Sequence, residues 1–170
     1  MSLGDINSTQ KGSGARYNDG KPALNLIPLR LIAHDLRRRI GTKPEVHAME
    51  FLAAFQERDP RFTDRSALER IPGLFPVDIW KDCANVFTYG LKKYAEWNWA
   101  KGMSWSAVIG CAARHLMDMA EGTVNDHESG LPHRGHFMCN IVMLLTYLDN
   151  YPQGDDRMPA SIFHPQEPAE

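Results

Sequence analysis

The chain has 170 residues, the length of one domain, which we place at residues 1–170. Hydrophobic residues make up 43% and charged residues 24%, a composition that supports a folded core and excludes wholesale disorder. The formal net charge is −2, so the chain lacks the basic field expected of a protein that binds a nucleic acid polymer.

The cysteines and the apolar runs indicate the cellular compartment in which the protein is expected. Three cysteines form an odd and sparse set without a CxxC pair, which is no disulfide framework. The N-terminal segment is polar, and the longest apolar runs, such as Ile141–Leu145, are far too short to span a bilayer. We therefore expect a cytoplasmic protein with reduced thiols and no membrane contact.

The predicted elements are helices, with irregular segments at both ends of the chain. Residues 1–15 are rich in Gly and Ser and predict a mobile arm. Helical spacing of apolar residues predicts a helical core over residues 16–150, with helices at 29–40, 45–58, 77–94, 105–121 and 131–150 and a short helical piece at 66–70. The proline-rich residues 151–170 predict a tail without a long helix. The predicted fold class is all-α: a compact helical bundle with a flexible arm and a proline-rich tail.

The segment RYNDGKP, residues 16–22, carries a turn signal at Asn18–Gly20. Arg16 and Lys21 flank this turn, so the segment could fold over a bound anion as a clamp. The alternative is a surface turn before the first helix, which the sequence alone favours.

The segment YGLKKYAEWNWAKGM, residues 89–103, combines lysines with aromatic side chains. Aromatic rings can stack on a nucleotide base, ammonium groups can bind phosphates, and Asn98 can hydrogen-bond a base edge. The alternative is that the aromatic residues belong to the core and the lysines are solvated.

Four histidines and several acidic residues gather between residues 114 and 140. His133, His136 and Asn140 follow one another at i, i+3 and i+7, so they form one polar stripe within about 60° of a helix surface. His115 lies on the preceding predicted helix, and the short loop between the two helices indicates antiparallel neighbours. Two such stripes facing each other would form a site of imidazole, carboxylate and amide groups.

This site could hold a divalent metal ion, since Mg²⁺ prefers oxygen ligands and imidazole shifts the preference toward Mn²⁺ and other transition metals. Alternatively, the histidines could act as acids, bases or phosphate donors. They could also be hydrogen-bonded without any ligand role, or hold a structural zinc ion.

Four blocks of the sequence together resemble one family. They are RYNDGKP, the segment containing GLKKYAEWNW, the pair Arg114–His115, and DHESGLPHRGHFMCN at residues 126–140. In this order they are similar to the phage and bacterial family of dATP/dGTP diphosphohydrolase N-terminal domains. The resemblance covers roughly residues 16–28 and 85–150. Residues 30–75 carry no block, and we interpret them as a lineage-specific insertion.

The resemblance implies an all-α, MazG-like nucleotide pyrophosphohydrolase, although the E-x-x-E and E-x-x-D pairs of MazG are not found in this sequence. Such an enzyme cleaves dATP or dGTP to the monophosphate and pyrophosphate with Mg²⁺ or Mn²⁺. An alternative is a non-catalytic protein that sequesters a precursor or signalling nucleotide. By analogy we expect a homo-oligomer, located in the host cytoplasm if a phage encodes it.

Carried over by position, the resemblance implies three sets of site residues. The expected metal ligands are Asp126, Glu128, His133 and His136. The expected catalytic residues are Glu128, His115 and Asn140. The expected substrate-binding residues are Arg16, Asp19, Lys21, Lys93, Tyr94, Asn98, Trp99 and Arg114.

Overall fold

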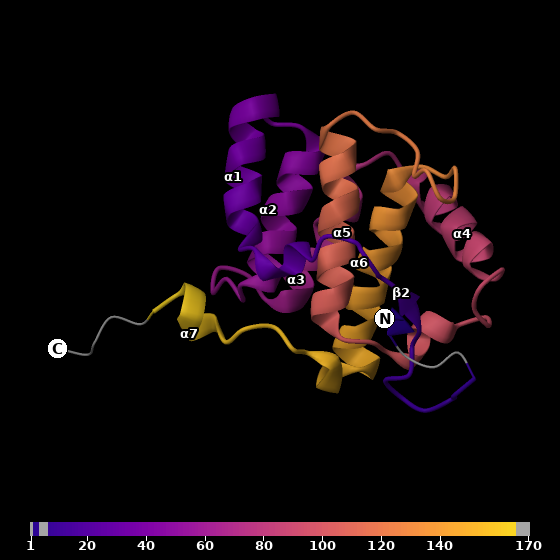
Figure 1. Cartoon of the computed structure of the whole chain (residues 1–170). Coiled ribbons are helices and arrows are strands. Elements are labelled where there is room, and N and C mark those ends of the chain that lie inside the picture. The colour runs from indigo at the N-terminus through magenta and orange to yellow at the C-terminus, as the bar shows by residue number, and fades with distance from the viewer. Residues whose placement is uncertain (1, 4–6, 166–170) are drawn as a thin grey trace.

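The central element of the computed structural model is α6, which packs against α3, α4 and α5 (Figure 1). Helix α5 also packs against α2, and α2 in turn packs against α1. The structure describes residues 2–3 and 7–165. The helices are α1 (Leu29–Ile40), α2 (Pro44–Gln56), α3 (Asp64–Glu69), α4 (Ile79–Gly90), α5 (Trp105–Ala120), α6 (His133–Asn150) and α7 (Ala160–Phe163). Short 3-10 turns lie at η1 (Leu24–Leu26), η2 (Pro72–Leu74), η3 (Asn98–Lys101) and η4 (Pro152–Gly154).

The predicted helical bundle is confirmed, and one hydrophobic core joins its helices. Apolar residues at helical spacing place one stripe of each helix in this core, where burial of each large side chain contributes about 1.5–3 kcal/mol. Fully buried side chains include Leu29, Leu52, Phe55, Ile109, Leu116, Phe137 and Tyr147. The described strands are only a two-residue pair, β1 (Ser2–Leu3) and β2 (Arg16–Tyr17), which pair antiparallel.

The helix expected at 77–94 is shorter in the structure, because α4 ends at Gly90. Glycine is a poor helix former, and the N–H groups of Lys93 and Tyr94 both donate to the Gly90 carbonyl in the turn that follows. Trp97 then adopts a left-handed φ of 61°, which is uncommon for a non-glycine residue. This irregular segment brings aromatic side chains back toward α4.

The described part of the N-terminal arm is attached to the bundle. The N–H of Gly12 donates to the Lys101 carbonyl at 2.6 Å, and the N–H of Gly14 donates to the Gly102 carbonyl at 2.9 Å. Gly12 also lies against Tyr151, since a Cβ there would come within 2.6 Å of the tyrosine oxygen. The arm expected at residues 1–15 lies partly outside the described residues, at 1 and 4–6.

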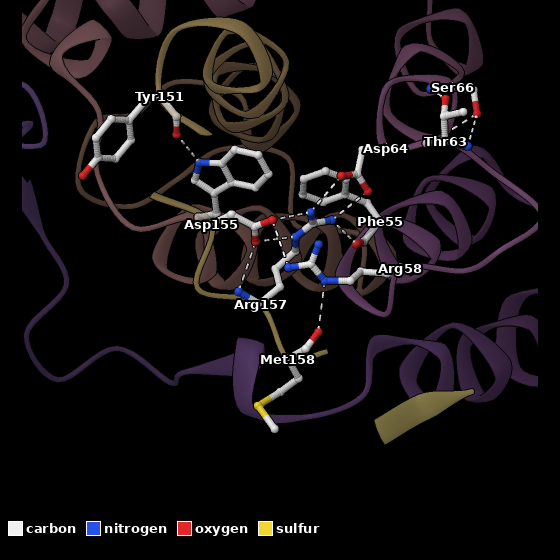
Figure 2. Close-up of polar contacts among 10 residues, drawn as sticks. Phe55, Arg58, Thr63, Asp64, Ser66, Tyr151, Asp155, Arg157 and Met158 are labelled. Carbon is white, nitrogen blue, oxygen red and sulfur yellow. Dashed lines mark hydrogen bonds and ion pairs between the residues drawn. The ribbon is translucent and has the colours of Figure 1, made fainter. Parts of the chain in front are cut away.

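Arg157 attaches the C-terminal segment to the core (Figure 2). Its guanidinium donates to both carboxylate oxygens of Asp64 at 2.8 and 2.9 Å, to Asp155 at 2.8 Å, and to the Phe55 carbonyl at 2.6 Å. It also lies over the rings of Phe55 and Trp105, at 4.1 and 5.0 Å from their centroids. The expected tail at 151–170 therefore begins as an ordered strap, and its last residues, 166–170, lie outside the described residues.

Within the part of the chain that the structure describes, no helix combines the length and apolar character needed to cross a bilayer.

Candidate functional site

A cavity of about 780 Å³ lies between the N-terminal arm, α4, η3, α5 and α6. The loop between α5 and α6 contributes Asp126, Glu128 and Ser129 to its wall. Figure 1 shows this loop extending beyond the ends of both helices toward α4. A backbone bridge between Asn125 and Pro132 closes the loop, so it holds its acidic residues close to the start of α6.

Three histidines meet beside the cavity, and two of them, His115 and His136, line it. The Nδ1 atoms of His115 and His133 lie 2.9 Å apart, and the rings of His115 and His136 stack with centroids 4.8 Å apart. Burial lowers the pKa of His136 to about 4 and also lowers the pKa of His133, with the nearby His115 acting in the same direction. At neutral pH these two imidazoles are therefore uncharged and able to offer a lone pair.

Ser129 joins the carboxylate of Asp126 to the imidazole of His136. Its N–H and its hydroxyl both donate to Asp126 Oδ2 at 2.9 Å, and its oxygen lies 2.7 Å from His136 Nε2. A hydroxyl that donates to a carboxylate accepts from its other neighbour, so His136 carries the proton on Nε2. Burial alone would raise the pKa of Asp126, but the two hydrogen bonds from Ser129 hold the pKa of this carboxyl below its usual value.

His115, Asp126 and His133 could hold a metal ion together, because one ligand atom from each lies within 4.8 Å of the others. The lowered pKa values of Asp126 and His133 fit this role, since metals bind deprotonated carboxylates and neutral imidazoles. Asp118 lies 3.6 Å from His133 Nδ1 and adds a negative charge beside the triad. Of the four expected ligands, Asp126 and His133 belong to this triad. His136 and Glu128 lie outside it, and His115, expected as a catalytic residue, takes the third place.

Residues 16–22, which continue the N-terminal arm, bring two cations to the cavity. Arg16 donates to the Asn140 side-chain oxygen at 2.7 Å, which places the expected residue Asn140 against the arm. Lys21 forms an ion pair with Glu128 at 3.2 Å, and both side chains are partly exposed. These contacts join segments more than 100 residues apart and place both cations beside the cavity.

Arg114 lies behind this clamp rather than facing the cavity. Its guanidinium donates to the Pro22 carbonyl at 2.9 Å and to the Asn18 side chain at 3.0 Å, on either side of the turn that contains Asp19. Asp19 itself is exposed and does not line the cavity. We therefore assign Arg114 to holding the arm in place.

Aromatic side chains also line the cavity. Trp99 stacks on Phe87 with centroids 5.2 Å apart, and Tyr94 and Lys93 line the same wall. Asn98, expected to contact a base edge, is instead buried and bonded to the N–H and carbonyl of Ala15. Its role in the structure is to attach the arm.

Cys111 and Ser129 are site residues that the sequence reasoning missed. Cys111 lines the cavity, and its sulfur accepts from the Asn140 amide at 3.6 Å. Burial would raise the pKa of this thiol, but Arg16 and a hydrogen bond with His115 lower it to about 5. The signals were present: Cys111 precedes His115 by four residues, which puts both on one helix face, and Ser129 stands inside the block of acidic residues and histidines.

Comparison with known proteins gives two matches. Residues 50–157, more than half of the chain, match the family described as dATP/dGTP diphosphohydrolase, N-terminal. A protein of Salmonella phage PMBT28 named dATP/dGTP diphosphohydrolase is 27% identical over 99 residues, which are 58% of this chain and 28% of that protein. This chain therefore aligns with less than a third of that relative's length. No solved structure matches the chain.

The family match corrects the interpretation of residues 30–75 as an insertion, and it does not include the RYNDGKP block. Because the match begins at residue 50, residues 50–75 belong to the family region and are not a lineage-specific insertion. The arm with Arg16 and Lys21 precedes the matched range. The match includes the aromatic segment, α5, the acidic loop and α6, and on this basis the chain belongs to the dATP/dGTP diphosphohydrolase, N-terminal, family.

Proposed function

We propose that this chain is a metal-dependent hydrolase that cleaves dATP or dGTP between the α and β phosphates, giving the monophosphate and pyrophosphate. The observation that carries the proposal is a single cavity that joins a histidine–carboxylate centre, two cations and an aromatic wall. A nucleoside triphosphate needs all three, because its phosphates are anionic, its hydrolysis needs an activated water, and its base stacks on aromatic rings.

In this proposal His115, Asp126 and His133 hold the divalent ion. A bound ion would lower the pKa of a water molecule and stabilise negative charge on a phosphate oxygen. The donor set of two imidazoles and one carboxylate favours Mn²⁺ over Mg²⁺, because Mg²⁺ prefers oxygen ligands.

Chain residues on either side of this centre supply the remaining roles. Glu128 takes the proton of the attacking water, which requires its ion pair with Lys21 to open when substrate arrives. Lys21 and Arg16 then neutralise the phosphates, together with Lys93, which also lines the cavity. Tyr94 and Trp99 hold the base or the sugar.

The test is to incubate the purified chain with dGTP or dATP and Mn²⁺ and to separate the products by ion-exchange chromatography. The proposal expects the deoxynucleoside monophosphate and pyrophosphate in equal amounts, and no turnover after chelation with EDTA. A diphosphate with orthophosphate, or a nucleoside with triphosphate, would contradict the choice of bond. Tight nucleotide binding without any turnover would instead support the non-catalytic, sequestering alternative.

A further inference from the structure

Two helices that wall the cavity come unusually close at Gly135. A Cβ on this glycine would lie 2.7 Å from the Asp82 carbonyl oxygen, so α4 and α6 could not pack at this distance with a larger residue there. Arg134 strengthens the contact, because its guanidinium pairs with both Asp78 and Asp82. The start of α4 is thereby fixed against the start of α6.

The same close approach brings two thiols together, because Cys83 directly follows Asp82 on α4 and Cys139 lies one turn after Gly135 on α6. The sulfur atoms of Cys83 on α4 and Cys139 on α6 lie 3.5 Å apart, and the Cys139 thiol also donates to the Cys83 carbonyl at 3.3 Å. Both residues are buried, with 4% and 3% exposed, yet both line the cavity. A small oxidant that enters the cavity can therefore reach sulfur atoms that bulk solvent does not.

We propose that Cys83 and Cys139 form a site of reversible oxidation, at which a hydroperoxide converts the two thiols into an intramolecular disulfide between α4 and α6. A disulfide needs a sulfur separation of about 2.05 Å, so the sulfurs must approach by roughly 1.5 Å. Rotation of the two side chains and a small shift of α4 supply this movement. The bond would join the helix that carries Phe87 to the helix that carries His136, and so fix the width of the cavity.

The reaction balances with the hydroperoxide as the oxidant. The Cys83 thiolate attacks the outer peroxide oxygen, the O–O bond breaks, and an alcohol (water for hydrogen peroxide) leaves as Cys83 becomes a sulfenic acid. The Cys139 sulfur then attacks the Cys83 sulfur, forming the S–S bond and releasing water with the thiol proton. Both thiols together lose two electrons, and the peroxide gains them. A dithiol reductant reverses the change.

The test treats the full chain with hydrogen peroxide, blocks the remaining thiols by alkylation, and maps the peptides by mass spectrometry. We expect the number of free thiols to fall from three to one, a Cys83–Cys139 linked peptide, and recovery of all three thiols with dithiothreitol. The Tm of the oxidised chain should rise by roughly 5–10 °C, because the bond closes a long loop.

Single variants make the assignment specific. Cys111→Ser keeps the pair and should still form the bond, whereas Cys83→Ser and Cys139→Ser should both lose it and the rise in Tm. A disulfide that contains Cys111, cross-linking only between chains, or three thiols that remain free at full peroxide exposure would overturn the proposal. None of these measurements depends on nucleotide turnover, so they stand apart from the proposed function.

Discussion

The Nδ1 atoms of His115 and His133 lie 2.9 Å apart, although the two residues belong to different helices and are 18 residues apart in the chain. Two ring nitrogens at this distance can share one proton, because two protonated rings would repel each other and place two hydrogens in the same gap. A metal ion bound by both nitrogens would take the place of this shared proton. Asp126 completes a set of three ligand atoms at this point.

Replacing His115 tests the proposed metal centre. His115→Ala removes one of three ligand atoms, so we expect the affinity for Mn²⁺ to fall at least about 10-fold. Isothermal titration of the nucleotide-free chain with Mn²⁺ measures it. The matched control is His127→Ala, which removes an exposed imidazole from the loop that carries Asp126. Equal losses in both variants would contradict the triad.

Glu128→Gln tests the proposed proton acceptor. The amide cannot take a proton, so we expect kcat with dGTP to fall by about 10²- to 10⁴-fold. Because the Glu128 side chain is partly exposed and a solvent-accessible ion pair contributes little to stability, the Tm should change little. Glu121→Gln, at the end of α5, is the matched carboxylate control and should keep the wild-type rate. A Glu128→Gln rate near that of the wild type would place the proton acceptor elsewhere.

Substitutions of Ser129 test whether its hydroxyl positions Asp126 and His136. Ser129→Ala removes the side-chain donor to Asp126 and the acceptor for His136, so we expect Mn²⁺ affinity to fall by about 10- to 100-fold. Ser129→Thr retains the hydroxyl and should restore most of this affinity. Failure of threonine to do so, with the Tm of both variants unchanged, would show that the hydroxyl is not the important group.

Arg157 tests how strongly the C-terminal strap stabilises the fold. Arg157→Ala leaves the carboxylate of Asp155 without its main partner in a half-buried position, so we expect the free energy of unfolding to fall by about 3 kcal/mol. Urea denaturation measures the loss. Arg39→Ala removes an exposed arginine paired with the exposed Asp35 and should cost at most about 1 kcal/mol. A similar loss for both would mean that the buried pairing adds nothing.

The same strap predicts a dependence on pH. Burial would raise the pKa of Asp155, but hydrogen bonds from Arg157 hold it below the usual 3.8. A carboxyl with a lowered pKa in the folded state stabilises the protein above its unfolded-state pKa and loses this contribution as the pH falls toward the folded-state value. The stability difference between the wild type and Arg157→Ala should therefore be constant from pH 7 to 5 and shrink below pH 4. Urea midpoints across this range measure it, and a difference that grows on acidification would contradict the assignment.

The helices could be predicted from the sequence wherever local signals agree. The first helix was predicted at its observed bounds, Leu29–Ile40, because its apolar residues keep one stripe and Gly41 ends it. The helix predicted at 77–94 was too long, because apolar and aromatic residues continue past Gly90 while the backbone turns away. The spacing of apolar side chains does not show at which residue the backbone leaves the helix.

The candidate site was partly predictable for a related reason. A short loop between two helices predicts that their polar stripes meet, and the structure does bring His115 and His133 together. The pairing of Arg16 with Asn140 joins segments 124 residues apart, and no local pattern specifies it. For the same reason Asn98 looked available to a ligand, whereas the folded chain uses it to hold Ala15.

The ring of Tyr151 sets a boundary for shortening this protein. It lies at the end of α6 and fills the space left by Gly12 in the arm and Gly102 before α5. A fragment ending at residue 150 would keep every helix that walls the cavity, yet it would lose the ring against which the arm rests. Since Arg16 follows only four residues after Gly12, such a fragment should leave Arg16 and Lys21 less firmly placed, and it would also lose the contacts of Arg157 with Phe55 and Asp64.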